Sequence, residues 1–337
     1  MPKLDRQQLA AAAASVRRTG PRFYNLERTP AHGLGDFLRW QWQSRGKFPP
    51  GQRFPLRPVD DARLAAPVAP QLTWIGHSTF LFQHRGLNLL TDPVFSERAS
   101  PFQWLGPRRY TPPALTVAAL PPIHQVLISH NHYDHLDHHS VMALHQRFGD
   151  ALTWFVPTGV AAWFHRRGIR QVRECGWWEG AEQDGAEAFL VPAQHFSGRG
   201  VSDGNHSLWG GWIWDCGDLR LYFAGDTGYG GCFAEIGALF PDIDLALIPI
   251  GAFEPRWLMQ PVHVNPDEAV RIHRDIGARR SVGMHWGTFV LTDEPMDAPP
   301  HVLQRALAEQ QVPSTDFIVM AHGETLSGPE LLSSRVE

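Results

Sequence analysis

The sequence has little cysteine and no apolar run long enough to cross a bilayer. Its three cysteines, Cys175, Cys216 and Cys232, are far apart and odd in number. They therefore predict neither a disulfide framework nor a thiolate zinc site, and they favour a reducing, cytoplasmic location. No run approaches the ~20 apolar residues that a membrane-spanning helix needs, so any membrane contact is expected to be peripheral.

The sequence also lacks an excess of basic residues. Its 30 lysines and arginines and 34 aspartates and glutamates give a formal net charge of −4, and no basic stripe is visible. This balance argues against a nucleic-acid partner bound through its phosphates. The 337 residues are 43% hydrophobic, which is enough for a sizeable core, and they predict a globular chain.

The first 70 residues carry few signals of regular structure and are rich in proline, arginine and aromatic side chains. Residues 37–42 are expected to be helical. Residues 9–16 are interpreted as a short helix or a frayed end, because Arg17 and Arg18 follow at once and no cleavage site of a signal peptide is present. Residues 1–70 are therefore expected to form an N-terminal extension packed on the core.

From Leu72 onward, short apolar runs alternate with turns and with helical patterns, which predicts an α/β fold. Asn265 precedes Pro266 and two acidic residues, a strong signal for the start of a helix. The other helices are expected over 138–148, 160–167 and 301–310. Strands are expected over 72–75, 79–82, 87–90, 126–129, 152–156, 171–174, 188–191, 212–214, 219–224, 245–250, 281–284 and 317–320.

Residues 95–122 form a long segment with neither helical nor strand periodicity. A loop of this length inside a compact domain is usually functional. It contains Phe95, Phe102, Trp104, Leu105 and Tyr110. These side chains are expected either to contact a lipid or another apolar substrate, or to pack on the N-terminal extension.

A cluster of potential metal ligands directly follows an apolar run. Residues 126–129 have the composition of a buried strand, and residues 130–135 read His-Asn-His-Tyr-Asp-His. His130 and His132 are two residues apart, so their rings project to one side of an extended chain and can bind the same ion. Asp134 and His135 come where the chain turns toward a helix, and they aim elsewhere. This difference predicts a second ion.

Three further ligand residues each follow a separate predicted strand. His195 follows 188–191, Asp226 follows 219–224, and His285 follows 281–284. Strands that end in ligands predict a metal site at one edge of a sheet. Imidazole and carboxylate without thiolate suit Zn²⁺, with Mn²⁺ or Fe as alternatives. The prediction is that one ion is bound by His130, His132 and His195, the other by Asp134, His135 and His285, and both by Asp226.

Two residues outside this set are candidates to support it. A metal-bound imidazole needs an acceptor for its second N–H, and His77 and Asp92 follow strands near the expected site. Asp92 could equally be a carboxylate that caps the turn before Pro93. The remaining histidines are expected at the surface, among them His138, His139, His206 and His322.

Together these motifs resemble those of the metallo-β-lactamase superfamily, over about residues 71 to 325. The shared features are the HxHxDH motif at 130–135, a later His195, Gly225-Asp226-Thr227 and a final His285. More narrowly, four segments look like those of the N-acyl-phosphatidylethanolamine-hydrolysing phospholipases D and their bacterial relatives. These segments are 74–79 (WIGHST), 91–95 (TDPVF), 129–137 (SHNHYDHLD) and 285–288 (HWGT).

The resemblance implies that residues 71–330 form a hydrolase domain, an αββα sandwich of two mixed β-sheets flanked by helices. It implies the metal assignments above and adds His263 as a substrate-contacting histidine. The implied enzyme is a zinc-dependent phosphoric diester hydrolase of phospholipase D type. Two Zn²⁺ would hold a bridging hydroxide that attacks phosphorus, and Asp134 or Asp226 would orient it. His263 would contact a phosphoryl oxygen or the acyl carbonyl, and the products would be phosphatidic acid and an N-acylethanolamine.

Two other functions are compatible with the same residues. One is a hydrolase of a soluble substrate, such as a sugar-phosphate lactonase or another phosphodiesterase, which would not require the 95–122 loop to be apolar and exposed. The other is a non-enzymatic metal protein, which would need a closed ligand shell where water is expected to reach the bridging position. The sequence leaves the oligomeric state open, a homodimer included.

Overall fold

Two seven-stranded β-sheets packed face to face form the body of the protein. The computed structural model describes residues 4–14, 16–27, 33–43, 49–200 and 202–332. One sheet has the strand order β16-β3-β4-β5-β6-β7-β8, and the other has the order β15-β14-β13-β12-β11-β10-β9. In each sheet one part is antiparallel and the other parallel. The predicted α/β class and the pair of mixed sheets are confirmed.

The first sheet consists of β3 (Gln71–Gly76), β4 (Thr79–His84), β5 (Leu87–Thr91), β6 (Gln125–Leu127), β7 (Thr153–Pro157), β8 (Val172–Cys175) and β16 (Thr325–Ser327). The second consists of β9 (Gly180–Gln183), β10 (Ala186–Val191), β11 (Gly211–Asp215), β12 (Arg220–Phe223), β13 (Leu245–Pro249), β14 (Arg280–Met284) and β15 (Phe317–Ile318). A separate hairpin joins β1 (Arg17–Thr19) to β2 (Arg22–Tyr24).

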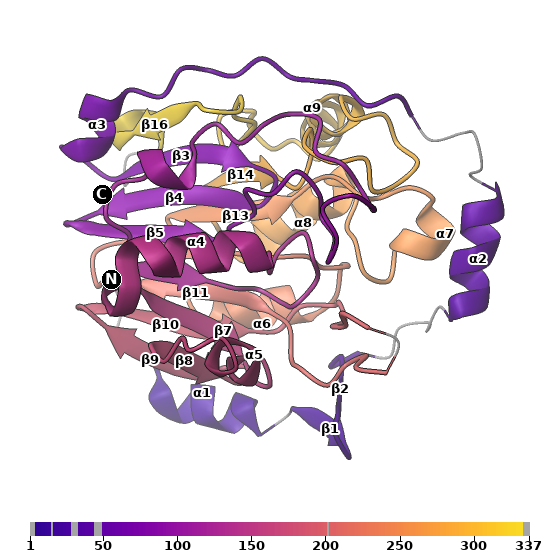
Figure 1. Cartoon of the computed structure of the whole chain (residues 1–337), viewed down its shortest axis with the longest axis horizontal. Coiled ribbons are helices and arrows are strands. Elements are labelled where there is room, and N and C mark those ends of the chain that lie inside the picture. Colours follow the sequence, from indigo (N-terminus) through magenta and orange to yellow (C-terminus); the bar gives the residue numbers. More distant parts are fainter. Residues whose placement is uncertain (1–3, 15, 28–32, 44–48, 201, 333–337) are drawn as a thin grey trace.

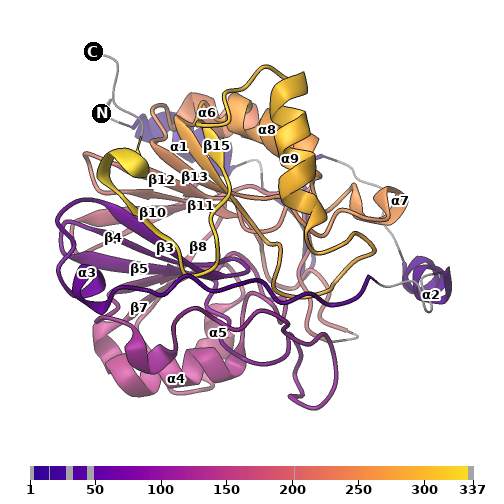
Figure 2. The same cartoon turned by 90° about the horizontal axis from the view of Figure 1, so that it is seen from above.

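The helices are α1 (Arg6–Ala13), α2 (Leu34–Gln43), α3 (Asp61–Ala65), α4 (His138–Phe148), α5 (Ala161–His165), α6 (Cys232–Leu239), α7 (Arg256–Met259), α8 (Pro266–Asp275) and α9 (Ala298–Glu309). Figure 2 shows α4 and α5 on the outer side of the first sheet and α6, α8 and α9 on the outer side of the second. The sandwich therefore has the layer order helix, sheet, sheet, helix. None of the described helices combines the length and apolarity needed to cross a bilayer.

Both faces of the first sheet are buried, and its strands alternate between two cores. Phe80 and Phe82 of β4 point into the core between the sheets, whereas Leu81 points to the core beneath α4. This alternation follows from the two-residue repeat of a strand. Each large side chain that leaves water here contributes roughly 1.5–3 kcal/mol, so the sandwich has ample driving force to form.

Two tryptophans of β11 connect the sheets through hydrogen bonds. The indole N–H of Trp212 donates to the Ile128 carbonyl at 2.8 Å, and that of Trp214 donates to Gln125 Oε1 at 2.7 Å. Both indoles are fully buried, so a lost partner would leave a costly unpaired donor. These bonds fix the register of the second sheet against β6, the strand that precedes the histidine cluster.

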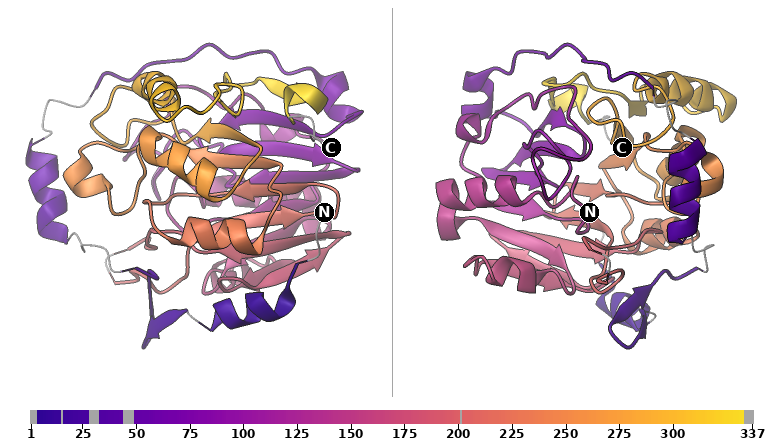
Figure 3. Two further views of the ribbon diagram at one scale, coloured as in Figure 1. Left: turned by 180° about the vertical axis from the view of Figure 1, so that it is seen from behind. Right: turned by 45° about the vertical axis from the view of Figure 1, so that its right-hand side comes forward.

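The N-terminal segment runs around the outside of the sandwich (Figure 1). Arg6 of α1 pairs with Glu187 of β10 at 2.5 Å, and Leu9 joins the main core. Helix α2 lies beside α7, as both views of Figure 3 show. There the Arg39 guanidinium lies 5.3 Å from the ring centroid of Trp257. The segment thus contacts the core at several places, and a domain boundary at residue 70 stays a prediction.

The predicted strands and helices are present, with ends shifted by a few residues. The sequence did not indicate β1, β2, β9, β16, α3, α6 or α7. The 95–122 loop contains a short 3₁₀ turn at Val117–Ala119 and an isolated antiparallel bridge between Arg98 and Arg108, but no strand or α-helix. Phe102, Trp104 and Leu105 are exposed. Tyr110 is also 41% exposed, but its ring lies so close to Gly51 that a Cβ there would overlap it. Both expected roles of the loop therefore stay open: contact with a lipid or apolar substrate for its exposed residues, and packing on the N-terminal extension for Tyr110.

Candidate metal centre

All seven predicted ligand residues lie at one edge of the sandwich. His130 follows β6, and Asp226 and His285 follow β12 and β14. Strand β10 runs parallel to β12, because each is antiparallel to β11, so His195 reaches the same edge. Each sheet contributes ligands: the first supplies the 130–135 cluster and the second supplies the other three residues. The site therefore spans the junction between the two sheets.

Three imidazoles form the first group of candidate ligands. His132 Nδ1 lies 2.8 Å from His130 Nε2 and 3.2 Å from His195 Nε2. His130 and His195 are almost completely buried. Four ligands at about 2.1 Å around a tetrahedral ion lie about 3.4 Å apart, so these separations suit a shared cation with slight spreading. His130, His132 and His195 also form one of the groups of potential ligand atoms that lie within 4.8 Å of one another.

The second group gathers around two carboxylates. Asp134 Oδ2 lies 3.4 Å from His135 Nε2, 3.5 Å from His285 Nε2 and 3.2 Å from His77 Nε2. These four residues have ligand atoms within 4.8 Å of one another. The structure thus brings His77 to the same distance as the predicted ligands. Its supporting role stays a prediction, because a direct ligand role fits this geometry equally well.

Asp226 lies between the two groups. Its Oδ2 is 3.1 Å from His135 Nε2 and 4.0 and 3.9 Å from the Nε2 atoms of His130 and His195. Its Oδ1 is 3.2 Å from His285 Nε2. One carboxylate can therefore reach both groups, as the predicted bridge requires. The bridging role itself stays a prediction.

Several buried polar atoms at this edge make no hydrogen bond to the described part of the chain. They are His135 Nε2, Asp226 Oδ1, His263 Nδ1 and both ring nitrogens of His285. Buried polar atoms are nearly always paired, so a cluster without partners calls for a ligand. The donor set, imidazole nitrogen and carboxylate oxygen, fits divalent transition metals such as Zn²⁺.

Hydrogen bonds to the far side of each ring fix three imidazoles in the orientation that metal binding needs. His135 Nδ1 donates to Asp92 Oδ2 at 2.6 Å, and His195 Nδ1 donates to the Val262 carbonyl at 2.9 Å. The Ser129 hydroxyl donates to Asp92 at 2.5 Å, so its oxygen accepts from His130 Nδ1 at 2.9 Å. Nδ1 of each ring is then the protonated nitrogen that bonds to the protein, and Nε2 faces the centre.

Asp92 therefore lies where the sequence placed a supporting carboxylate. It is fully buried and also accepts from the Ser129 N–H at 2.7 Å. Ser129 and the Val262 carbonyl were not recognised from the sequence. Ser129 directly precedes His130, and this adjacency was the available signal. The Val262 carbonyl had none, since a main-chain acceptor depends on the path of a distant loop, here the one between β13 and β14.

Burial keeps the first group of imidazoles neutral. It lowers the pKa of His132 to about 3 and that of His195 to about 4, and it holds the pKa of His130 well below its usual value. Their histidine neighbours lower the pKa of His130 and His132 further, because a second positive charge nearby is unfavourable. At neutral pH these rings offer lone pairs rather than protons, which is the form that binds metal.

The second group is dominated by negative charge. Burial alone would raise the pKa of Asp226, but the positive charges of His135 and His285 hold it well below the usual value. Burial alone would lower the pKa of His285, yet Asp226 and Asp134 raise it to about 9. Buried carboxylates need positive charge beside them, and a divalent cation can take the place of these protons.

Local backbone strain marks the same edge. His77, Asp92 and His285 have φ values of 56°, 30° and 62°, which non-glycine residues rarely adopt. Such strain is common at sites where function dictates side-chain direction. Gly225, with φ of 61°, precedes Asp226, and a Cβ there would lie 2.5 Å from Ser129 Cβ. Only glycine lets the Asp226 turn pass this close to the 129–130 segment.

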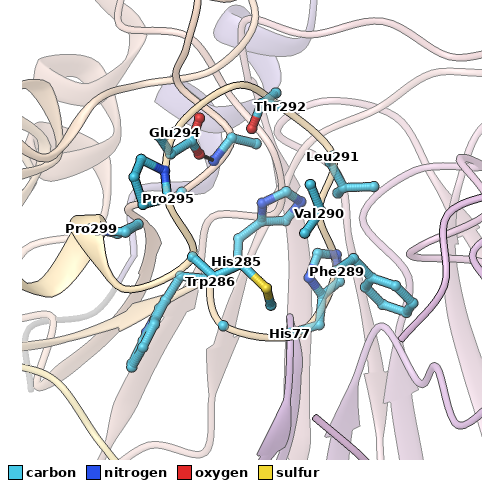
Figure 4. Close-up of a pocket in the computed structure, with 14 residues that line it drawn as sticks. His77, His285, Trp286, Phe289, Val290, Leu291, Thr292, Glu294, Pro295 and Pro299 are labelled. Carbon is cyan, nitrogen blue, oxygen red and sulfur yellow. Dashed lines mark hydrogen bonds between the residues drawn. The ribbon is translucent and has the colours of Figure 1, made fainter. Parts of the chain in front are cut away.

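A pocket opens beside the second group (Figure 4). His77 and His285 lie at its inner side, with Phe289, Val290 and Leu291 along one wall. The partly buried Glu294 side chain accepts from the main-chain N–H of Ala252 at 2.6 Å, which fixes the facing loop. Further lining residues are Gly251, Trp286, Gly287, Thr292, Pro295, Met296 and Pro299. The sequence gave no signal for this pocket.

His263 lies at the rim rather than in either ligand group of the prediction. Its Nδ1 is 4.0 Å from Asp226 Oδ2, and its side chain is 15% exposed. It also forms a group of potential ligand atoms with His195 and Asp226. Burial holds its pKa well below the usual value, so the ring is neutral at pH 7. This position is open enough for a substrate to reach it, and the predicted substrate contact remains a prediction.

One prediction about the remaining histidines is wrong. His138, His139 and His206 are exposed as expected, but His273 is buried, and so is His322. Its ring stacks on Trp74 with centroids 4.0 Å apart, and its Nε2 lies 3.2 Å from Thr288 Oγ1. An imidazole with a polar partner and an aromatic stack is accommodated in a core at little cost, and sequence alone did not reveal these neighbours.

Comparison with known proteins decides the family. Residues 87–286, more than half of the chain, match the model described as the beta-lactamase superfamily domain. The chain belongs to the beta-lactamase superfamily. The chain is 41% identical to N-acyl-phosphatidylethanolamine-hydrolyzing phospholipase D 1 of Caenorhabditis elegans, over 75% of its own length and 74% of that protein. It is 37% identical to the mitochondrial N-acyl-phosphatidylethanolamine-hydrolyzing phospholipase D of Saccharomyces cerevisiae, over 69% of this chain and 50% of the yeast protein.

Solved structures show the same beta-lactamase fold. A metallo hydrolase from Ignicoccus hospitalis superposes on this superfamily member with a TM-score of 0.58 and 22% identity. The match covers 77% of this chain and 99% of the archaeal one. Fold, family and the clustered histidines and aspartates together make the protein a metallo-hydrolase of the beta-lactamase fold.

Proposed function

We propose that the protein is a dinuclear-metal phosphodiesterase of phospholipase D type that acts on lipids like N-acyl-phosphatidylethanolamine. The observation that carries this proposal is the pair of ligand groups that share Asp226. Paired divalent ions suit in-line displacement at phosphorus, where charge develops on both entering and leaving oxygens. The 41% identity to a relative named for this lipid supports the substrate class.

The residues of this chain have separable roles in the proposal. His130, His132 and His195 would hold one Zn²⁺, and Asp134, His135 and His285 the other. Asp226 would bind both, with Mn²⁺ or Fe as alternatives to zinc. When bound, the two cations lower the pKa of water and neutralise charge on phosphoryl oxygens.

The other roles belong to the chain itself. Asp92 and Ser129 keep the Nε2 lone pairs of His135 and His130 directed at the centre. Asp134 and Asp226 provide the carboxylate oxygens that can orient the attacking water. Neutral His263 at the rim can hydrogen-bond a phosphoryl oxygen or the acyl carbonyl. Water adds to phosphorus, the bond to the head-group oxygen breaks, and phosphatidic acid and an N-acylethanolamine are released.

Exposed apolar side chains favour a lipid over a soluble substrate. Phe102, Trp104 and Leu105 in the 95–122 loop are 51%, 74% and 56% exposed. A loop tip with three large apolar residues in water is unfavourable unless another surface covers it. We propose that this tip inserts into the lipid interface, where aromatic side chains are accommodated well.

The test is hydrolysis of N-acyl-phosphatidylethanolamine in mixed micelles by zinc-loaded protein. Asp134→Asn and metal-free protein serve as controls, and N-acylethanolamine is quantified by mass spectrometry. Release that both controls abolish is expected. Cleavage of a small soluble phosphodiester without release from the lipid would reject the lipid substrate and leave a dinuclear phosphodiesterase. Activity that survives in metal-free protein would reject the metal mechanism.

A further inference from the structure

Asn25, in the N-terminal segment, contacts the main chain of a candidate metal ligand. Its Nδ2 donates to the His195 carbonyl at 3.0 Å, and its Oδ1 accepts from the His195 N–H at 3.2 Å. The side-chain amide thus binds both polar main-chain groups of one residue, as a neighbouring strand would. Asn25 lies outside residues 87–286, the range that the family model matches.

His195 lies beyond the end of its strand, so the hydrogen bonds of the sheet do not fix its main chain. Strand β10 ends at Val191, and the last strand-like pairing is the isolated bridge between Gln194 and Gly228. The ring is fixed at Nδ1 by the Val262 carbonyl, as described above. One bond to the ring still leaves the peptide unit free to tilt. The two bonds from Asn25 remove that freedom.

Asn25 is itself held in place by the core. The indole N–H of Trp209, which is fully buried, donates to Asn25 Oδ1 at 3.0 Å. Two residues earlier, buried Phe23 donates its main-chain N–H to the Asn205 carbonyl at 2.9 Å. Two residues later, Glu27 Oε1 accepts from the Gly231 N–H at 2.6 Å. The segment around Asn25 is therefore anchored on both sides.

We infer that Asn25 is a positioning residue for the ion that His130, His132 and His195 would share. Zinc–nitrogen distances in metal sites are held to within roughly 0.2 Å, so a small shift of the His195 main chain is enough to weaken the binding of that ion. The role rests on the proposed metal centre. It assigns part of that centre to the N-terminal segment, so the ion is held by three parts of the chain rather than by the two sheets alone.

The experiment compares full-length wild type, Asn25→Ala and Asn25→Asp. Asp keeps the acceptor for the His195 N–H but loses the donor to its carbonyl. Glu27→Ala is the matched control, because it removes one main-chain hydrogen bond of the same segment without touching a candidate ligand. Affinities for two Co²⁺ ions are measured by competition with a chromophoric chelator, and the visible cobalt spectrum and the melting temperature of metal-free protein are recorded.

Loss of a group that supports a metal-bound imidazole typically weakens metal binding about 10- to 100-fold. Asn25→Ala and Asn25→Asp are each expected to lower the affinity for one Co²⁺ ion at least about tenfold and to alter the visible absorption band of that ion. The affinity for the other ion should stay within about twofold of the wild-type value. Glu27→Ala should leave both affinities unchanged. If wild type and both Asn25 variants bind metal with equal affinity, this inference is overturned while the metal centre stands. The same holds if Glu27→Ala loses as much metal affinity as the Asn25 variants. Wild type that binds no metal would overturn both.

Discussion

Replacing Asp92 by Asn tests whether a single buried carboxylate sets the protonation of the imidazoles that are candidate metal ligands. The change preserves size and shape, and an amide oxygen can still accept from the Ser129 N–H. The second atom becomes an NH₂ group that faces His135 Nδ1, where two donors would meet. His135 can avoid this clash only by moving its proton to Nε2, and the ring then has no lone pair for the centre.

The magnitude follows from the contacts of Asp92. The bond to His135 Nδ1 is 2.6 Å long, joins two fully buried groups and involves an ionised acceptor, so it belongs to the stronger class. The Ser129 hydroxyl, which orients His130, depends on the same carboxylate. We therefore expect the upper end of the usual 10- to 100-fold loss of metal affinity, which is about 2.7 kcal/mol at 25 °C.

The assay is chelator competition on the purified variant, with Thr79→Val as the control. The Thr79 hydroxyl donates to the Asp92 carbonyl at 2.7 Å, so its loss disturbs the same turn without touching an imidazole. The control should lose stability and keep its metal affinity. Metal affinity of Asp92→Asn within threefold of wild type would refute the reasoning, because His135 would then have found its tautomer without the carboxylate.

Three further results are expected. Burial lowers the pKa of His322 to about 3, whereas the unfolded chain has about 6.5. The unfolded state therefore binds more protons between these values, and this one ring should account for up to about 1.4 kcal/mol per pH unit of the stability that wild type loses as pH falls from 6.5. His322→Gln should show a shallower loss in urea unfolding. Replacing Phe102 and Trp104 by Ser should lower micellar lipid hydrolysis about tenfold or more, since each aromatic contributes on the order of 1–3 kcal/mol when it leaves water. Arg220→Met should lower the free energy of unfolding, measured in urea, by about 3 kcal/mol, because the buried guanidinium of Arg220 pairs with Asp215 at 2.7 Å.

Each of these results has a matched comparison. A pH profile of His322→Gln that parallels wild type would mean that this ring does not control acid sensitivity. Equal loss of soluble phosphodiester cleavage in the loop variant would point to misfolding of the loop rather than to weaker lipid contact. Arg305→Met removes the pairing with Glu309, whose side chain is 61% exposed, and should cost under about 1 kcal/mol. A similar cost for Arg220 and Arg305 would contradict the role of burial.

The strands and the candidate ligands at their ends were predictable because each depends on local sequence pattern. Short apolar runs bounded by turns indicate buried strands, and a polar residue just after a run must emerge at the sheet edge. His130, Asp226 and His285 all follow this rule. Parallel strands then bring residues from distant segments together without further information. The same logic located Asp92, which follows β5.

The remaining features depend on contacts between distant segments. Strand β16 has only three residues and gains its order by pairing with β3 at the other end of the chain. Helix α6 contains Gly237, a poor helix former, which is needed because a Cβ there would lie 2.4 Å from the Asp275 carbonyl of α8. His322 and Asn25 belong to the same class: their surroundings come from segments whose approach no local pattern encodes.

Because the candidate ligands lie on both sheets, metal binding is expected to stabilise the contact between the sheets as well as to supply the chemistry. Each ion would tie the two sheets together at this edge, in addition to the side-chain packing and the hydrogen bonds that already join them. A ligand present at 1,000 times its Kd stabilises the folded state by about 4.1 kcal/mol. Metal-starved protein should therefore open first at this edge, so proteases would cut there before the interior strands unfold.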